Sequence, residues 1–327
     1  MTDSPAALFA GSITHLKAGV GGALVVTGSH GGSFVAEYAL RLGAGALVCH
    51  DAGLGLQRAG VAGLEMLDRH AIPAVAVSHD SARIGDAGDM AARGILSTVN
   101  RAAHALGLRP GQPCRDAVAA LAGRGRVAAG PAGRGAGQGG PAPVHRHSLG
   151  IVATRLFPES LEIVCLDSAS DIHAGDAGKI VLTGSHGSVP ADEAASAVKA
   201  GVRLAAFNDA GIGIEEAGIA RLAVLDGMGI PGLAVAAASA RIGDGRSTFE
   251  TGIVSRANTL AAALGIRPGD ALREILRPAG GVAPDSGKGA PAVGGRARAI
   301  CRLSESFWDS FLGRTVIHHV GWSWRPA

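Results

Sequence analysis

The stretch LVVTGSHG at residues 24–31 is repeated almost unchanged as IVLTGSHG at residues 180–187. Further motifs recur in the same order: HDAGLG at 50–55 and NDAGIG at 208–213, SARIGD at 81–86 and at 239–244, and LGLRPG at 106–111 and LGIRPG at 264–269. The offset between the two copies grows by two residues after the first motif, so one short insertion accounts for the whole alignment. Because chance does not produce such an ordered series, the sequence predicts an internal duplication.

Each copy alternates short apolar runs with longer amphipathic stretches. Runs such as LVV, ALVC and AVAV are continuous in Val, Leu, Ala and Cys, which is typical of parallel strands buried on both faces. Their alternation with amphipathic stretches predicts βαβ units. We therefore expect an α/β fold of internally duplicated three-layer, Rossmann-like domains with mostly parallel sheets, related by a pseudo-twofold axis. Another apolar run precedes each TGSHG motif, at 6–13 in the first copy and at 161–170 in the second.

Changes in composition mark the boundaries of the copies. Residues 123–150 and 278–297 are rich in Gly, Ala, Pro and Arg without periodicity, which predicts flexible linkers. The first α/β repeat then spans residues 1–122 and the second spans residues 151–277. Residues 298–327 begin with AICRLSES, a third echo of the strand before TGSHG, and end in a tail that holds the three tryptophans.

Composition excludes several classes of function. The net charge is only +3, the basic residues do not cluster with aromatic ones, and binding of nucleic acid is therefore not expected. No apolar stretch is long enough to span a membrane, and the N-terminus has no basic leader segment. The four cysteines show no CxxC spacing, which favours reduced thiols in the cytoplasm.

The polar residues that follow the predicted strands are candidates for catalysis. In open α/β sheets ligands bind beyond the carboxyl ends of the strands. The TGSHG motif of each copy falls at this edge, and so do HDAGLG in the first copy and NDAGIG in the second. There a histidine can move a proton while an aspartate orients its ring. The predicted catalytic residues are Ser29, His30, Asp51, Ser185, His186 and Asp209. The alternative is that the Ser and His side chains only bind loop amides, and that an Asp only caps a helix.

The SARIGD motif and its surroundings predict a site for an anion. Its arginine offers a fork of donors that suits a carboxylate or a phosphate. The predicted substrate-binding residues are Arg83, Asp86, Asn208, Arg241, Asp244 and Arg246. The alternative is an ion pair of Arg83 with Asp51 and of Arg241 with Asp209, while the SARIGD aspartates serve as helix N-caps.

Two further patterns remain open. No cofactor is predicted, but His30, His50, Asp51 and His79 offer imidazole and carboxylate ligands for a divalent metal in the first copy. GILSTVN at 94–100 and GIVSRAN at 252–258 place Gly, Ser and Asn on one face of a predicted helix. We interpret that face as a packing contact rather than as a catalytic one.

These placements predict a cytoplasmic small-molecule enzyme, a hydrolase or a lyase. Its carboxylate-bearing substrate would lie in a cleft between the halves, held by the two SARIGD arginines, with the TGSHG histidine moving the proton. The alternatives are a non-catalytic ligand-binding or assembly protein, and a metal-dependent hydrolase centred on the first repeat. The expected partners are a small anionic substrate and further copies of the chain in a homo-oligomer, with neither nucleic acid nor membrane.

A loose likeness to caspase-type cysteine peptidases carries no activity across. In that family an apolar strand ends in His-Gly and a later strand ends in Asp-Ala-Cys. Here Gly53 and Gly211 stand where the nucleophilic cysteine belongs.

Overall fold

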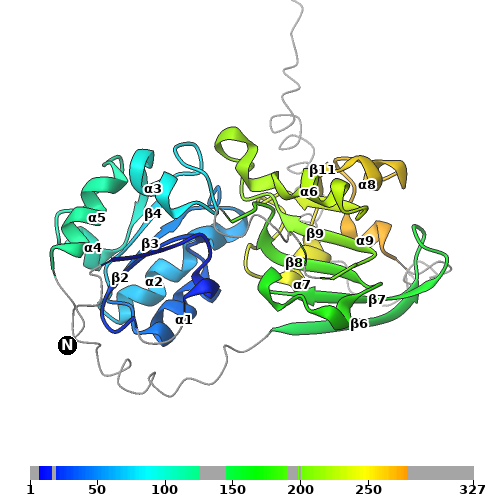
Figure 1. Ribbon diagram of the computed structural model, residues 1–327, viewed down its shortest axis with the longest axis horizontal. Coiled ribbons are helices and arrows are strands. Elements are labelled where there is room, and N and C mark those ends of the chain that lie inside the picture. The colour runs from blue at the N-terminus through cyan, green and yellow to red at the C-terminus, as the bar shows by residue number, and fades with distance from the viewer. Residues whose placement is uncertain (1–6, 17–19, 125–144, 191–197, 199, 278–327) are drawn as a thin grey trace, which may run out of the picture. The chain divides into compact units, whose positions relative to one another are not determined.

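The computed structural model describes residues 7–16, 20–124, 145–190, 198 and 200–277 (Figure 1). These residues form two mixed β-sheets of five and six strands with alternating helices, which is an α/β fold. We refer to residues 7–124 as the first half and to residues 145–277 as the second half. The predicted second linker, the AICRLSES echo and the tail lie outside the described residues, as does most of the first linker.

The first sheet adds its strands side by side in chain order. The strands are β1 (Ala7–Ala10), β2 (Leu24–His30), β3 (Ala46–His50), β4 (Ala74–Val77) and β5 (Leu96–Val99). The first four are parallel, and β5 pairs with β4 in the antiparallel direction. This order never reverses, so the sheet lacks the topological switch point at which dinucleotide-binding sheets form their crevice.

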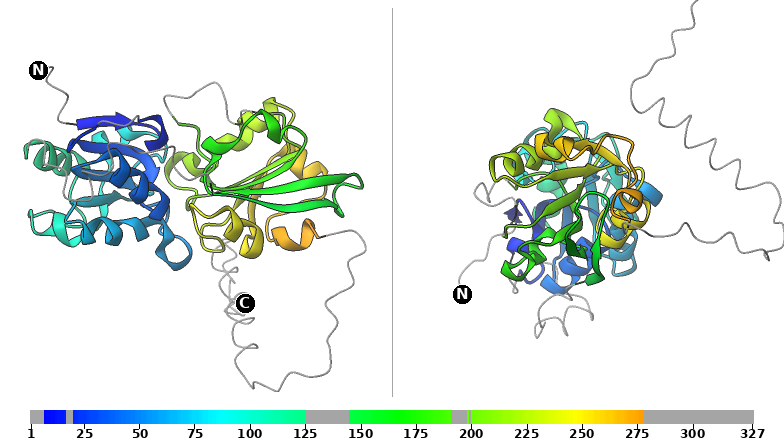
Figure 2. Two further views of the ribbon diagram at one scale, coloured as in Figure 1. Left: turned by 90° about the horizontal axis from the view of Figure 1, so that it is seen from below. Right: turned by 90° about the vertical axis from the view of Figure 1, so that its right-hand side faces the viewer.

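Helices cover both faces of the first sheet (Figure 2). The helices are α1 (Ser33–Leu42), α2 (Ala62–Arg69), α3 (Ala87–Arg93), α4 (Arg101–His104) and α5 (Cys114–Ala122), with 3₁₀ turns η1 (Ile13–His15) and η2 (Leu56–Val61). Side chains of α1 and α2 pack on one face, while those of α3, α4 and α5 pack on the other. Right-handed crossovers that advance in one direction along a sheet place their helices on the same face, which explains the shared side of α1 and α2.

The second sheet has the same order of strands and one additional strand. Its strands are β6 (Arg146–Ala153), β7 (Ser160–Leu166), β8 (Ile180–His186), β9 (Leu204–Asn208), β10 (Gly232–Val235) and β11 (Val254–Ala257). The strands from β7 to β10 are parallel, and β6 and β11 pair antiparallel at the two edges. The strand β6 begins inside the segment that the sequence assigns to the first linker.

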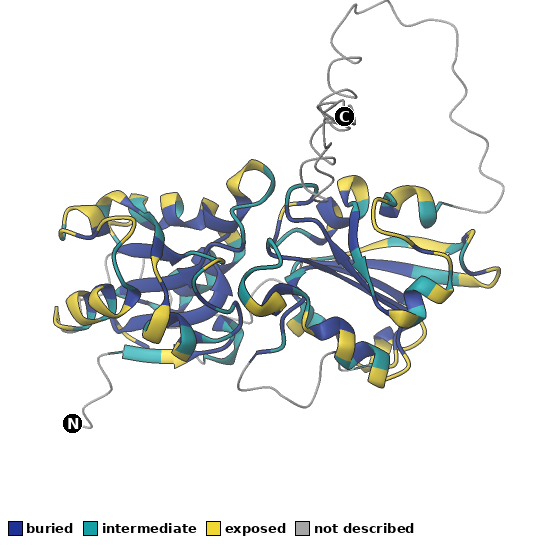
Figure 3. Ribbon diagram, turned by 90° about the horizontal axis from the view of Figure 1, so that it is seen from above, coloured by how far each residue is buried: buried dark blue, intermediate teal, exposed yellow. Residues whose placement is uncertain are grey.

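Helices and short turns of the second half also pack on both faces of their sheet. They are α6 (Arg221–Gly227), α7 (Gly245–Thr251), α8 (Thr259–Ala263) and α9 (Leu272–Ile275), with η4 (Ala169–Asp171), η5 (Ala174–Asp176) and η6 (Ile214–Ile219). The central strands of both sheets are almost entirely buried (Figure 3), as continuous apolar runs predict.

The predicted helix over GILSTVN and GIVSRAN is wrong. These segments form the edge strands β5 and β11, and each ends in an asparagine that caps the following helix. Asn100 accepts hydrogen bonds from Ala103 N and Ala74 N and donates to the carbonyls of Leu64 and Ile72. Asn258 makes the same four contacts in the second half. The asparagines thus tie the sheet edge to the helices, which a helical pattern does not reveal.

Candidate functional site

The two TGSHG serines serve the backbone. Ser29 Oγ accepts a hydrogen bond from Ile13 N at 3.0 Å, and Ser185 Oγ accepts one from Ala169 N at 2.8 Å. Each serine therefore fastens the 3₁₀ turn that follows the neighbouring strand β1 or β7. Neither serine is hydrogen-bonded to the histidine beside it, so the structure does not assemble a Ser–His pair from these residues.

The two TGSHG histidines are buried and neutral. His30 Nδ1 accepts a hydrogen bond from Gly32 N at 3.0 Å, which leaves the ring proton on Nε2. Burial, aided by the neighbouring His50, lowers the pKa of His30 to about 4. Burial and the nearby charge of Arg221 hold the pKa of His186 well below its usual value, and the buried His186 Nδ1 has no hydrogen-bond partner. Neither histidine is hydrogen-bonded to the aspartate that was predicted to orient it: Asp51 binds Gly53 and His79, and Asp209 binds Gly211 and Ala237.

His50 and Asn208 occupy equivalent positions and make equivalent contacts. His50 Nε2 donates to the carbonyl of Ala82 at 3.0 Å, and its Nδ1 accepts from Ala52 N at 3.1 Å. Asn208 Nδ2 donates to the carbonyl of Ala240 at 3.2 Å, and its Oδ1 accepts from Ala210 N at 2.9 Å. Both ring nitrogens of His50 are thereby used, and His50 and Asn208 each link two loops through equivalent hydrogen bonds.

Asp51 holds a different histidine from the one predicted. Its Oδ1 accepts hydrogen bonds from Gly53 N at 3.0 Å, from His79 N at 2.9 Å and from His79 Nδ1 at 3.1 Å. Asp51 is almost completely buried, whereas the His79 side chain is 24% exposed. Because β3 and β4 are neighbours, the residues that follow these strands meet at the same edge of the sheet.

Charge favours the ionised form of both members of this pair. Burial alone raises the pKa of Asp51, but the hydrogen bond from His79 and the nearby His50 outweigh it and lower the pKa. The hydrogen bond to Asp51 raises the pKa of His79 against the effect of burial, and the charges of Asp80 and Asp209 add to this. An imidazole held in this way keeps its proton to a higher pH than a free histidine does, and it can act as a general acid or base.

The second half lacks this pair because Ala237 stands at the position of His79. Asp209 Oδ1 accepts hydrogen bonds from Gly211 N at 2.9 Å and Ala237 N at 2.8 Å, which repeats the backbone contacts of Asp51. Its Oδ2 is buried and makes no hydrogen bond within the described chain. Burial raises the pKa of Asp209, in contrast to Asp51.

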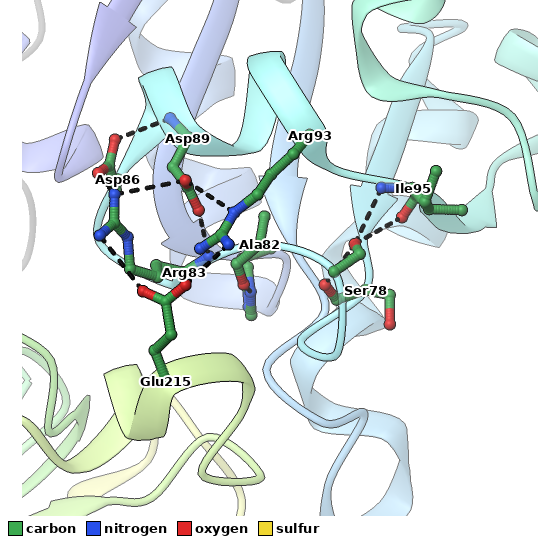
Figure 4. Close-up of polar contacts among 10 residues, drawn as sticks. Ser78, Ala82, Arg83, Asp86, Asp89, Arg93, Ile95 and Glu215 are labelled. Carbon is green, nitrogen blue, oxygen red and sulfur yellow. Dashed lines mark hydrogen bonds and ion pairs between the residues drawn. The ribbon is translucent and has the colours of Figure 1, made fainter.

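The SARIGD residues are engaged within the protein (Figure 4). Arg83 forms ion pairs with Asp86, Asp89 and Glu215 at 3.1 to 3.4 Å, although its Nε is buried without a hydrogen-bond partner. Glu215, from the second half, also pairs with Arg93 at 2.8 Å. These ion pairs occupy both terminal nitrogens of the Arg83 guanidinium, which was predicted to bind a substrate anion.

The corresponding residues of the second half are similarly engaged. Arg241 pairs with Asp244 at 2.7 Å and donates to Gln57 Oε1 at 3.3 Å. Arg246 pairs with Glu250 one turn along α7. Asp86 and Asp244 accept hydrogen bonds from backbone amides as the N-caps of α3 and α7. The capping alternative thus describes both SARIGD aspartates, while the arginines pair with residues other than Asp51 and Asp209.

The loops after Asp51 and Asp209 meet each other in an unusual conformation. All four residues from Ala52 to Gly55 have positive φ, between 49° and 69°, and the four residues from Ala210 to Gly213 have φ between 51° and 76°. A Cβ on Gly53 would lie 2.8 Å from the Cα of Gly211, so the two backbones touch. Non-glycine residues at positive φ cost free energy and concentrate at functional sites.

Two observations bear on a metal and on larger ligands. Among the described residues, no group of three His, Cys, Asp or Glu side chains is arranged to hold a metal ion. Of the predicted ligands, His50 uses both ring nitrogens on backbone groups.

A cavity of about 410 Å³ lies among η2, α2 and the end of β5, and none of the predicted site residues lines it. No helix in the described ranges is long and apolar enough to cross a membrane.

His79 is the residue whose role the sequence pattern missed. The sequence suggests only a metal-ligating role for His79, because alanine stands at the aligned position 237 of the second copy. His79 comes soon after β4, and Asp51 comes directly after the neighbouring strand β3. This shared edge is the signal that could have linked the two residues. No protein-family model, curated protein or solved structure matches the chain.

Proposed function

We propose that this protein is an enzyme, a hydrolase or a lyase, in which His79 exchanges a proton with a small-molecule substrate. The observation that carries the proposal is the hydrogen bond of 3.1 Å between His79 Nδ1 and Asp51 Oδ1. A buried carboxylate that holds one ring nitrogen fixes the orientation of an imidazole and stabilises its protonated form. The other nitrogen, Nε2, is then the atom that gives and takes the proton.

The surroundings of the pair favour a chemical role over a purely structural one. The amides of Gly53 and His79 hold the Asp51 carboxylate in place, so its charge acts on the ring without rearrangement. The His79 side chain is partly exposed, unlike His30, His50 and His186. The adjoining loop from Ala52 to Gly55 has the strained backbone that often accompanies active sites.

The arginine clamp on a substrate carboxylate is not part of this proposal. Arg83 and Arg241 already bind protein side chains, and a substrate anion would have to displace them. The buried, free thiols of Cys49, Cys114 and Cys165 fit the expected cytoplasmic location.

We further propose that the two halves arose by duplication and are related by a pseudo-twofold axis. Reciprocal contacts support this: Leu56 N donates to the Ala237 carbonyl at 2.7 Å, and Ile214 N donates to the His79 carbonyl at 2.8 Å. Equivalent residues of both halves also share one apolar cluster, formed by Ala52, Ala59, Ile84, Ala210, Ala217 and Ile242. On this basis the present site is specialised, with one half keeping the histidine and the other replacing it with alanine.

The test is a turnover screen against small esters, amides, lactones and hydroxy acids, followed by variants. With a substrate in hand, His79→Gln and Asp51→Asn should each lower kcat/KM by about a hundredfold or more. His70→Gln is the matched control, because His70 is an exposed histidine at the end of α2. Full activity of His79→Gln would refute the assignment.

The pH profile adds a second readout. If His79 is the base, activity should rise with pH through a pKa above 6.5, because Asp51 raises the pKa of His79. The Asp51→Asn variant should move that rise to lower pH. A rise that does not move when Asp51 is replaced would mean that another group titrates.

A non-catalytic assembly protein is the second candidate. The observation that favours it is that several predicted site residues already bind groups inside the chain. They are Ser29, Ser185, Arg83, Arg241 and Asp244. Such a protein would show no turnover in the screen. It would instead form a defined homo-oligomer, which analytical ultracentrifugation at several concentrations would reveal.

A further inference from the structure

The backbone of His79 is fastened to the second half of the protein. The carbonyl oxygen of His79 accepts a hydrogen bond from Ile214 N at 2.8 Å. A Cβ on Gly213 would lie 3.0 Å from the same oxygen, so the chain at Gly213 lies directly against it. On the other side, the amide of His79 donates to Asp51 at 2.9 Å. The main chain of His79 is therefore held by both halves at once.

The imidazole ring of His79 lies against the same loop of the second half. A Cβ on Gly211 would lie 2.9 Å from Gly53 Cα, 3.0 Å from His79 Cδ2 and 3.4 Å from His79 Nε2. Positive φ does not by itself call for this glycine, because Ala210 and Ile212 beside it also have positive φ, at 51° and 64°. The close approach does, since a side chain at position 211 would crowd the ring and the nitrogen to which proton transfer is assigned.

Charged groups of both halves face the ring. Asp51 and Asp80 of the first half raise the pKa of His79, and the charge of Asp209 in the second half adds to them. His50 is also near, and burial lowers its pKa. The loop that touches the ring follows directly after Asp209, so the second half acts on His79 by contact and by charge.

The reciprocal contact between the halves has no ring to hold. Leu56 N donates to the Ala237 carbonyl at 2.7 Å, and a Cβ on Gly55 would lie 3.0 Å from that oxygen. The main-chain contacts are thus the same on both sides, and the side chain differs, with an imidazole at position 79 and a methyl group at position 237. The same backbone change can therefore be made on either side, and on only one side does it reach the histidine.

We propose that residues 211–214 of the second half position the His79 imidazole on Asp51, so that the proton chemistry at His79 requires the contact between the two halves. These residues act through His79 and are positioning residues. The inference rests on the proposed function, because it makes the second half part of the same site. It also gives the second half a role in that site although alanine stands at position 237.

The test is an NMR titration of the histidine side chains in the full-length protein. The signal of His79 is identified by its loss in His79→Gln. In the wild-type protein the pKa of His79 should lie above 6.5, because of its bond to Asp51. Asp51→Asn should lower this pKa to about 6.5 or below, which marks the value of a ring without its aspartate.

A matched pair of proline variants then separates positioning from general stability. Ile214 and Leu56 are the first residues of η6 and η2, a position that accepts proline. Ile214→Pro removes the N–H that binds the His79 carbonyl, and the pKa of His79 should fall toward its value in Asp51→Asn. Leu56→Pro removes the equivalent N–H on the side of Ala237, and the pKa of His79 should stay unchanged.

Two results would overturn the proposal. One is an unchanged pKa of His79 in Ile214→Pro, and the other is an equal change in both proline variants. If Ile214→Pro does not fold, Gly213→Ala decides, with Gly55→Ala as its control. The two glycines have φ of 70° and 67°, and a Cβ on either would lie 3.0 Å from its partner carbonyl. An unchanged or equally lowered pKa again refutes the positioning role.

The titration needs no substrate, so its outcome does not depend on turnover. If the pKa of His79 responds as expected but His79→Gln keeps full activity with an identified substrate, the proposed reaction fails and the positioning stands. If His79→Gln is inactive but the proline variants do not differ, the reaction stands and the positioning role fails.

Discussion

Replacing His50 tests directly whether this buried histidine is a clasp or a chemical group. Its ring bridges the Ala82 carbonyl and the Ala52 amide, and Asn208 bridges the equivalent groups in the second half. An asparagine at position 50 can supply the same donor and the same acceptor. We therefore expect His50→Asn to be tolerated and His50→Ala to be strongly destabilising.

The magnitude follows from the two contacts. The alanine variant leaves a buried carbonyl oxygen and a buried N–H unpaired, at about 1–3 kcal/mol each, so the loss is about 2–6 kcal/mol before any cavity is counted. The asparagine variant keeps both bonds and loses only ring packing, which costs about 1 kcal/mol. Asn208→Ala should resemble His50→Ala, because it removes the matching pair of bonds.

Thermal unfolding followed by circular dichroism is the assay. In a protein of this size each kcal/mol shifts the midpoint by about 1–2 °C, so the alanine variant should unfold several degrees below the asparagine variant. The reasoning is refuted if His50→Asn is as destabilising as His50→Ala. That outcome would mean that the imidazole ring itself, and not its two hydrogen bonds, is required.

Three other perturbations have defined outcomes. Folding lowers the pKa of His30 from 6.5 to about 4. As the pH falls, His30 is therefore protonated in the unfolded chain before it is protonated in the folded one. The free energy of unfolding should drop by about 3 kcal/mol from this residue as the pH falls from 6.5 to 4. Denaturant titrations at several pH values check this, and a slope that His30→Gln leaves unchanged would contradict it. Gly28→Ala brings a Cβ within 2.6 Å of the backbone nitrogen of Asp86 and should cost about 2 kcal/mol or more; Gly88→Ala, at an exposed helical site with room for a Cβ, is the control and should be neutral or stabilising. Glu215→Gln copies Gln57 and removes the charge that pairs with Arg83 and Arg93, so the salt dependence of the unfolding midpoint should weaken, and an unaltered dependence would show that these pairs contribute nothing.

Local patterns in the sequence were enough to predict the class of fold and the edge where the polar residues lie. Continuous apolar runs become buried central strands, because a strand covered on both faces has no position for a polar side chain. The run at 6–13 and its echo at 161–170 contain the edge strand β1 and most of β7. The segments 94–100 and 252–258 were predicted wrongly, since spacing alone cannot separate a short edge strand from a helix.

Which side chains bind each other was decided only by the tertiary structure. His30 is the last residue of β2 and Asp51 follows the neighbouring strand β3, yet the Asp51 carboxylate binds His79, because the amides of Gly53 and His79 hold it on that side. Likewise, the repeat aligns His50 with Asn208, but only the structure reveals that the imidazole and the amide make equivalent hydrogen bonds. Residue types and order determine strands and edges through local periodicity. Partners are set by backbone donors and acceptors that come from distant parts of the chain, and only the folded arrangement of the sheets brings these groups together.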